Sequence, residues 1–142
     1  MIMKNEFYTL TPFNDTLLIA PVLAWDHRIA SLLFKDVNDM RSRYYRNRHW
    51  AILTDCRNWE LGTPEIEKML LQVSVSDLTA GLTHHAVVAG PSEIKKWQLS
   101  KGIREEKHFE SRIFETLADG KSWLASAGYH MRPVQAASSE AG

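Results

Sequence analysis

Two stretches near the N-terminus predict an antiparallel β-hairpin. Polar and apolar residues alternate over residues 6–11 and stop at Pro12, which is typical of a half-buried edge strand. Asn14-Asp15 is a turn-forming pair. Residues 16–23 form a second apolar run, so the two stretches are expected to pair, with Pro21 at a strand end or a bulge.

The hydrophobic period changes after Asp26, where apolar residues recur at spacings of three and four. This spacing predicts an amphipathic helix with one apolar stripe. The stripe consists of Ile29, Leu33, Val37, Met40 and Tyr44, and Lys35, Asp39 and Arg43 occupy the other face. The helix is expected to end in a basic stretch that begins at Arg41, because cations interact favourably with the negative end of the helix dipole.

Two short apolar runs without alternation predict strands that are covered on both faces. They are residues 50–55 and residues 84–90. A helix start follows each of them. Thr63-Pro64-Glu65 combines an N-cap, a proline suited to the first helical position and an acid near the positive end of the dipole. Ser92 is the expected cap of the second helix, which continues through Leu99.

The C-terminal part predicts one more strand and one more helix. Residues 112–114 are a brief strand candidate. Thr116 and Asp119 have the spacing of a capping box, in which the two side chains satisfy amide donors at a helix start. The helix is expected to run to about Ala127, with Leu117, Trp123 and Leu124 facing inward.

The predicted order of elements indicates one α/β domain over residues 1–129. Strands that alternate with helices after an N-terminal hairpin predict a mostly parallel sheet of four or five strands, flanked by four helices. Whether the helices cover one face or both is left open by the pattern. The Ala- and Ser-rich residues 130–142 are expected to form a flexible tail.

Composition and charge restrict the classes of function. Seventeen basic and seventeen acidic residues cancel, so no global field attracts nucleic acid, and no nucleic-acid partner is expected. The arginines and aromatic residues of residues 41–50 suit a helix end and a core better than base stacking. No apolar run approaches the ~18 residues of a membrane span, and no secretory signal pattern is present. With the lone Cys56, these features favour a cytoplasmic protein without an integral membrane segment.

Three sequence pieces resemble the SpoIIAA-like proteins, relatives of the STAS domain, which has the anti-sigma-factor-antagonist fold. The pieces are Trp50-Ala-Ile-Leu-Thr-Asp-Cys-Arg-Asn-Trp-Glu, Ala86-Val-Val-Ala-Gly-Pro, and Phe114 followed by Trp123-Leu124. With the order of elements, the resemblance covers nearly the whole chain to Tyr129. It implies a four- or five-stranded sheet with βα units, and a binding or regulatory role more than catalysis.

The chain departs from the STAS regulators that are switched by phosphorylation. Those regulators carry an Asp-Ser or similar pair at the mouth of the helix after the central strand, whereas Asp55 is followed here by Cys56-Arg57. The hydroxyl at this helix mouth belongs to Thr63, which is therefore a candidate phosphoacceptor and, alternatively, a plain N-cap. The resemblance also extends to Sec14-type lipid-binding folds, which implies a small apolar ligand as an alternative.

A polar crevice is the main candidate site for a ligand or partner. Ligands of open α/β sheets bind where the strands end. Asp55, Arg57, Asn58 and Ser92 follow two such strand ends, and Thr63 follows in the same loop. Asp55 has the alternative role of a structural acceptor for loop amides.

Other candidate chemistry is weaker. Cys56 lacks the arginine six residues later that the phosphatase pattern needs, because Gly62 is there. His84 and His85 point to opposite faces of a strand and cannot share a metal ion. Glycine-rich phosphate loops and nucleophile-elbow motifs are missing, so no catalytic residue, metal or cofactor is predicted.

Trp97, next to Lys95 and Lys96, resembles an interfacial anchor, although it is expected to cover the sheet while the lysines stay solvated.

The leading hypothesis is a non-enzymatic regulatory or protein-interaction domain that binds a protein partner or a second copy of itself. The alternative is a binder of a small apolar or lipid ligand between helices and sheet, which the five tryptophans suggest. A third hypothesis is an enzyme with Asp55 as its base.

Overall fold

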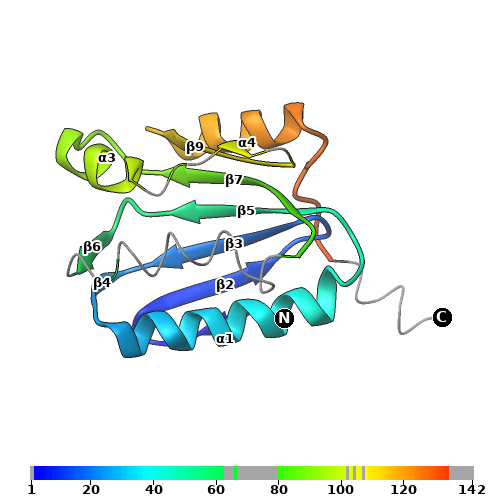
Figure 1. The fold of residues 1–142 in the computed structure, drawn as a ribbon, viewed down its shortest axis with the longest axis horizontal. Helices are drawn as coiled ribbons and strands as arrows, with labels where there is room; N and C mark the ends of the chain where they lie inside the picture. The colour runs from blue at the N-terminus through cyan, green and yellow to red at the C-terminus, as the bar shows by residue number, and fades with distance from the viewer. Residues whose placement is uncertain are drawn as a thin grey trace.

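A seven-stranded mixed sheet organises the protein (Figure 1). The computed structural model describes residues 2–62, 66, 80–101, 103, 105–106 and 108–134. The strands in sheet order are β1 Met3–Lys4, β2 Tyr8–Pro12, β3 Thr16–Pro21, β5 Trp50–Asp55, β7 Leu82–Val88, β9 Phe109–Phe114 and β8 Glu105–Glu106. Strands β3, β5, β7 and β9 are parallel, and the strands outside them pair antiparallel.

The predicted parallel strands with an antiparallel hairpin edge are confirmed as the core of the sheet. The sheet as a whole is mixed and not mostly parallel, since three of its six described pairings are antiparallel, and the predicted number of strands is wrong. The sheet has seven strands because β1 and β8, of two residues each, extend it at both edges. A further pair, β4 Leu23–Trp25 and β6 Trp59–Gly62, forms a separate two-stranded sheet. Strands of two or three residues are too short to show an alternation of polar and apolar residues in the sequence. Strand β6 lies between Asp55 and Thr63, a stretch that was expected to be a loop.

Three helices are defined in the described part of the chain: α1 His27–Tyr44, α3 Glu93–Ser100 and α4 Leu117–Ser126. The helix predicted from Thr63 lies outside the described residues, apart from Ile66, which is helical and buried. No helix among the described residues is long and apolar enough to cross a membrane.

The predicted caps Ser92 and Thr116 are confirmed. The Ser92 hydroxyl accepts a hydrogen bond from the amide of Lys95, and the Thr116 hydroxyl accepts from the amide of Asp119. The structure adds a cap that was not predicted, the Asp26 carboxylate, which accepts from the amide of Ile29. Each bond satisfies an amide that has no partner in the first turn of its helix.

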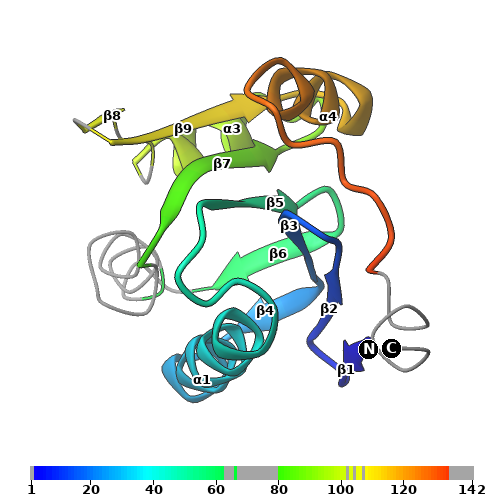
Figure 2. The ribbon, with the colours of Figure 1, turned by 90° about the vertical axis from the view of Figure 1, so that its right-hand side faces the viewer.

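The helices lie on both faces of the sheet, which the sequence pattern left open. Figure 2, a view along the strands, shows α1 on one side and α4 on the other. The α1 face is built around Leu10, Leu17, Ile52 and the predicted helix stripe, of which Ile29, Leu33, Val37 and Met40 are buried and Tyr44 is half-buried. Leu99 of α3 packs against this same cluster.

The α4 face has a smaller cluster of Ala51, Leu53, Ala86, Val88 and Leu124. Successive residues of β5 and β7 therefore belong to different faces, and both strands are covered on each side as predicted. Leu117 and Trp123 of α4 pack against the cluster, and the Trp123 and Phe114 rings lie 5.5 Å apart.

A β-bulge interrupts the alternation at the start of β7. Trp50 is paired with Leu82 and Ala51 with His84, so Thr83 is the extra residue. Its hydroxyl lies 2.9 Å from Nδ1 of His84 and is hydrogen bonded to the hydroxyl of Tyr129. The bulge therefore attaches the end of the α4 segment to the sheet.

The segment after Tyr129 is hydrogen bonded to the turn of the N-terminal hairpin. The Asp15 carboxylate accepts from the amides of His130 and Met131, at 3.0 and 3.2 Å. The Asn14 side-chain oxygen accepts from the amide of Arg132, and a β-bridge joins Phe13 to Pro133. Ordered contacts thus continue past residue 129, where the sequence predicts that the flexible tail begins.

Candidate functional site

The residues predicted to line a crevice lie at the carboxyl ends of β5 and β7, and Asp55 and Arg57 among them are paired with each other. Arg57 Nε donates to Asp55 Oδ1 and Arg57 Nη2 donates to Oδ2, both at 2.8 Å, and the Arg57 amide donates to Oδ1 at 3.2 Å. The guanidinium holds the pKa of Asp55 below its ordinary value, with the nearby Lys95 adding a smaller effect of the same sign. A carboxylate held in this way is a poor general base at neutral pH.

Lys95 of α3 closes the same corner and was not recognised as a site residue from the sequence. Its ammonium donates to the carbonyl oxygens of Cys56 and Arg57, at 3.0 and 3.1 Å. The Ser92 hydroxyl caps α3 by accepting from the Lys95 amide at 3.2 Å. Asp55, Arg57 and Ser92 are therefore brought together, with Lys95 between the loop and the helix, and these interactions are structural in kind.

The other candidates of this corner do not add a reactive group. Asn58 is exposed in the turn that leads to β6. Thr63 lies outside the described residues. Cys56 is 1% exposed, and burial raises the pKa of its thiol, which makes it unsuited to nucleophilic attack.

The two adjacent histidines lie on opposite faces of the sheet, as predicted. His84 contacts the rings of Trp123 and Tyr129 on the α4 face. His85, on the α1 face, lies with Nε2 2.7 Å from the hydroxyl of Thr54, and burial lowers its pKa to about 4. Among the described residues, no three histidine, cysteine or acidic side chains are grouped in a way that could hold a metal ion.

The exposed face of α3 is a feature that the sequence interpretation placed wrongly. Trp97 was expected to cover the sheet, but its side chain is 63% exposed, and Ile94, one turn before it, is 72% exposed. The lysines are the inward residues instead: Lys95 reaches the loop after β5, and Lys96 is paired with Glu93 and Glu115. The orientation of α3 about its axis explains this difference. The half-buried Leu99 packs against the core, so Lys95, one turn earlier on the same side of the helix, points inward and Trp97 points to solvent. We call Ile94, Trp97 and Lys101 the α3 outer face; the Lys101 ammonium lies 4.2 Å from the centre of the Trp97 ring.

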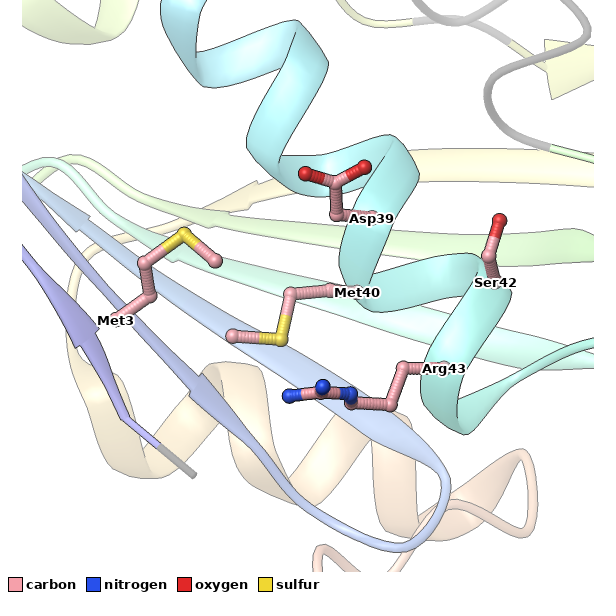
Figure 3. Close-up of a pocket in the computed structure, with 5 residues that line it drawn as sticks. All are labelled: Met3, Asp39, Met40, Ser42 and Arg43. Carbon is pink, nitrogen blue, oxygen red and sulfur yellow. The ribbon is translucent and has the colours of Figure 1, made fainter.

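A surface pocket of about 440 Å³ lies at the other side of the molecule, between β1 and the second half of α1. It is lined by Met3, Asp39, Met40, Ser42 and Arg43. Figure 3 shows the Met3 and Met40 side chains extending toward each other, with the Arg43 side chain alongside them. No sequence motif marked this pocket, because it depends on the pairing of β1 with β2.

The sheet order and the helices on both faces define an α/β domain with a SpoIIAA-like fold, so the resemblance found in the sequence is confirmed at the level of the fold. The chain is similar to the crystal structure of an uncharacterised protein of the DUF3478 family with a SpoIIAA-like fold, from Shewanella loihica PV-4. The TM-score is 0.60 and the sequence identity 13%, over 86% of this chain and 98% of that chain. No family model and no curated protein matches the sequence. At this identity the similarity shows the fold alone.

Proposed function

We propose that this protein is a non-enzymatic interaction domain that binds a protein partner through the α3 outer face. The observation that carries the proposal is the exposure of Trp97 and Ile94, 63% and 72%, one helical turn apart. Tryptophan is among the residues that contribute most to protein interfaces, because its large rigid ring buries much area at little cost in conformational entropy.

The anchoring of α3 supports this function. The helix buries none of its residues completely, yet it is held at its start by the Ser92 cap and by the two bonds of Lys95 to the loop after β5. A rigid helix that presents an aromatic side chain to solvent loses little further freedom when a partner binds. The cation–π contact of Lys101 also favours this orientation of the indole ring.

The pairing of the crevice residues favours binding over catalysis. Both oxygens of Asp55 are bonded to Arg57, Lys95 is bonded to two carbonyl oxygens, and Cys56 is buried. Among the described residues of this corner, every charged group is thus committed to holding α3 and the β5 exit in place. These contacts position the α3 outer face.

The test compares partner capture by two variants that change exposed side chains on different helices. Trp97→Ala and Ile94→Ala together remove the two apolar side chains of the α3 outer face, and Leu32→Ala removes an apolar side chain of α1 whose residue is 45% exposed. A partner captured by chemical cross-linking in the native cell, then purified, should lose at least about tenfold in affinity for the α3 variant. Its affinity for Leu32→Ala should be unchanged. Equal affinities for the two variants, with unchanged melting temperatures, would contradict the proposal.

One observation favours the second candidate, the binding of a small apolar ligand between helix and sheet. The indole nitrogen of Trp59 is buried and has no hydrogen-bond partner within the described part of the protein. The rings of Trp59, Trp25 and Tyr8 follow one another at centre distances of 5.2 and 5.7 Å, which forms an apolar environment with one unused donor. Native mass spectrometry of gently purified protein, together with thermal shifts across a panel of lipids, tests this candidate; an empty protein and no shift would eliminate it.

A further inference from the structure

The two edges of the seven-stranded sheet differ in chemistry. Within the described residues, the terminal strands are β1 and β8, with two residues each. Strand β8 consists of Glu105 and Glu106, which are both exposed. Strand β1 consists of Met3 and Lys4, and it follows Ile2, which is 63% exposed. An edge strand presents backbone groups that can pair with another strand, and charges on the edge are a common protection against such pairing.

The β1 edge, which has one apolar residue and one lysine where β8 has two glutamates, is next to the pocket of β1 and α1. Met3 is half-buried and packs against the α1-face cluster, whereas Lys4 is exposed. The side chains of Met3 and Met40 extend toward each other in the pocket, with the Arg43 side chain next to Met40 (Figure 3). Asp39, of opposite charge to Arg43, also lines the pocket one turn earlier on α1, and its carboxylate points away from the methionines. Strand addition uses two features, backbone pairing at an edge and a side-chain pocket beside it, and this edge has both.

From these observations we propose that the β1 edge is the interface of a symmetric homodimer. Strand β1 pairs antiparallel with β1 of a second copy across a twofold axis, so the sheet continues from one copy into the other. In this arrangement the two α1 helices lie antiparallel on the same side of the joined sheet. This surface is separate from the α3 outer face, so the proposal stands or falls independently of the proposed function.

The order of residues selects the register. Residues directly opposite each other in an antiparallel pair point to the same face. With Met3 opposite Met3 of the second copy, both methionines face the α1 side and fill the pockets beside Met40. Lys4 is then opposite Ile2 of the second copy, so no like charges face each other across the pair.

Charge complementarity supports a second copy as the occupant. A symmetric interface must be complementary to itself, because the same surface of both copies takes part. Asp39 and Arg43 both line the pocket at this edge, so each copy brings one acidic and one basic side chain toward the axis, and the two copies do not meet as like charges. Pairing of β8 with β8 of a second copy is unfavourable, because both residues of the strand are glutamates. Every register that pairs the two strands therefore places one glutamate opposite another.

The experiment is disulfide cross-linking of single-cysteine variants of the full chain. The native Cys56 is 1% exposed and does not compete. In the proposed register, Met3→Cys places two cysteines directly opposite, with Cα atoms about 4.5–5.5 Å apart, which a disulfide can span. Mild oxidation of Met3→Cys should give a covalent dimer of twice the 16.3 kDa chain mass.

Ile2→Cys and Lys4→Cys are the matched controls. Neither should cross-link alone, and a mixture of the two should, because residue 2 of one copy faces residue 4 of the other. Sedimentation of the unmodified protein should show a dimer, and Met3→Glu should weaken it by about tenfold or more. The control Ile94→Glu makes the same type of change on α3 and should leave the dimer intact.

Each outcome decides the proposal. A monomer at every concentration overturns it, as does a dimer that Met3→Cys does not cross-link or that only Ile94→Glu disrupts. The last result would instead support self-association through α3. If Met3→Glu is unfolded by circular dichroism, the cysteine series still decides, because those substitutions add no charge at the edge.

Discussion

The two faces of the sheet are packed with side chains of different size. The α1 face contains large aromatic residues, among them Trp50, which is fully buried and stacked on the ring of Tyr45 at 4.9 Å. The α4 face places Ala51, Ala86 and Gly120 where helix and sheet meet. A Cβ atom on Gly120 would lie 3.2 Å from Leu53 Cδ1 and 3.3 Å from Val88 Cγ2. The first face is therefore expected to be sensitive to lost volume, and the second to added volume.

The largest effect is expected from Trp50→Ala on the α1 face. The substitution removes the stack on Tyr45 and the hydrogen bond that the indole donates to the Ala80 carbonyl oxygen, and it leaves a cavity in the core. Such a change costs about 3–5 kcal/mol of unfolding free energy, measured by urea denaturation. A loss below about 1 kcal/mol, as is usual for exposed sites, would show that the α1 face can repack. The two faces would then not differ in their sensitivity to lost volume.

The next largest effect is expected in the pH dependence of stability, to which the adjacent residues His84 and His85 contribute differently. The pKa of His85 is about 4 against an ordinary 6.5, because burial disfavours its charged form. The unfolded chain therefore binds more protons between these values, so stability is complete above pH 6.5 and decreases as the pH falls toward 4. The decrease reaches about 3 kcal/mol at ~1.4 kcal/mol per pH unit.

His85→Gln should flatten this part of the stability profile in denaturation experiments between pH 7 and pH 4. His84→Gln is the control on the other face. Burial also lowers the pKa of His84, but the charge of Glu110 opposes that shift, so its replacement should change the profile less. If His84→Gln changed the pH dependence of stability more than His85→Gln, the α4 face would be the one that desolvates its histidine more strongly.

Added volume is tested at Gly120 on the α4 face. Gly120→Leu forces α4 away from Leu53 and Val88, which is expected to cost about 1–3 kcal/mol. Ala118→Leu is the matched control, since Ala118 is exposed on the same helix. The two variants are compared by thermal unfolding; equal stabilities would mean that α4 can move outward without loss, and that the close approach is not needed.

The smallest effect is expected where the two faces end, at the β5 exit. Asp55→Asn removes the ion pair with Arg57 and should cost about 1 kcal/mol or less at neutral pH, since Arg57 is largely exposed. Because the native pKa of Asp55 is lowered, this contribution is present above the ordinary carboxylate pKa and is lost as the pH falls through the native value. The wild type and the variant should thus become equally stable in acid, which denaturation at a series of pH values measures.

The elements that periodicity and capping define were predictable from the sequence. The stripe from Ile29 to Met40 and the caps Ser92 and Thr116 depend on neighbours within a few residues, so local pattern is sufficient for them. The apolar runs of β5 and β7 are equally clear. Asp55 and Arg57 are paired at the β5 exit, and Lys95 joins their loop to the helix that Ser92 caps, so these residues lie where the sequence placed them. Their use as a binding site stays a prediction.

What the sequence did not predict depends on distant parts of the chain. The two-residue strands β1 and β8 exist through pairing with β2 and β9, not through their own composition. The rotation of α3, which exposes Trp97 and turns Lys95 inward, is set by its packing on β9 and by the loop after β5. Tyr45 is buried next to the half-buried Tyr44 because its hydroxyl donates to the carbonyl oxygens of Phe13 and Thr16.

The bonds between Asp15 and residues 130–131 have a consequence for the order of synthesis. They join positions 115 and 116 residues apart, and both donors follow every described strand in the chain. Because the ribosome makes a chain from its N-terminal side, the hairpin turn forms without these two amides. It gains them only when residues 130–131 have emerged from the exit tunnel.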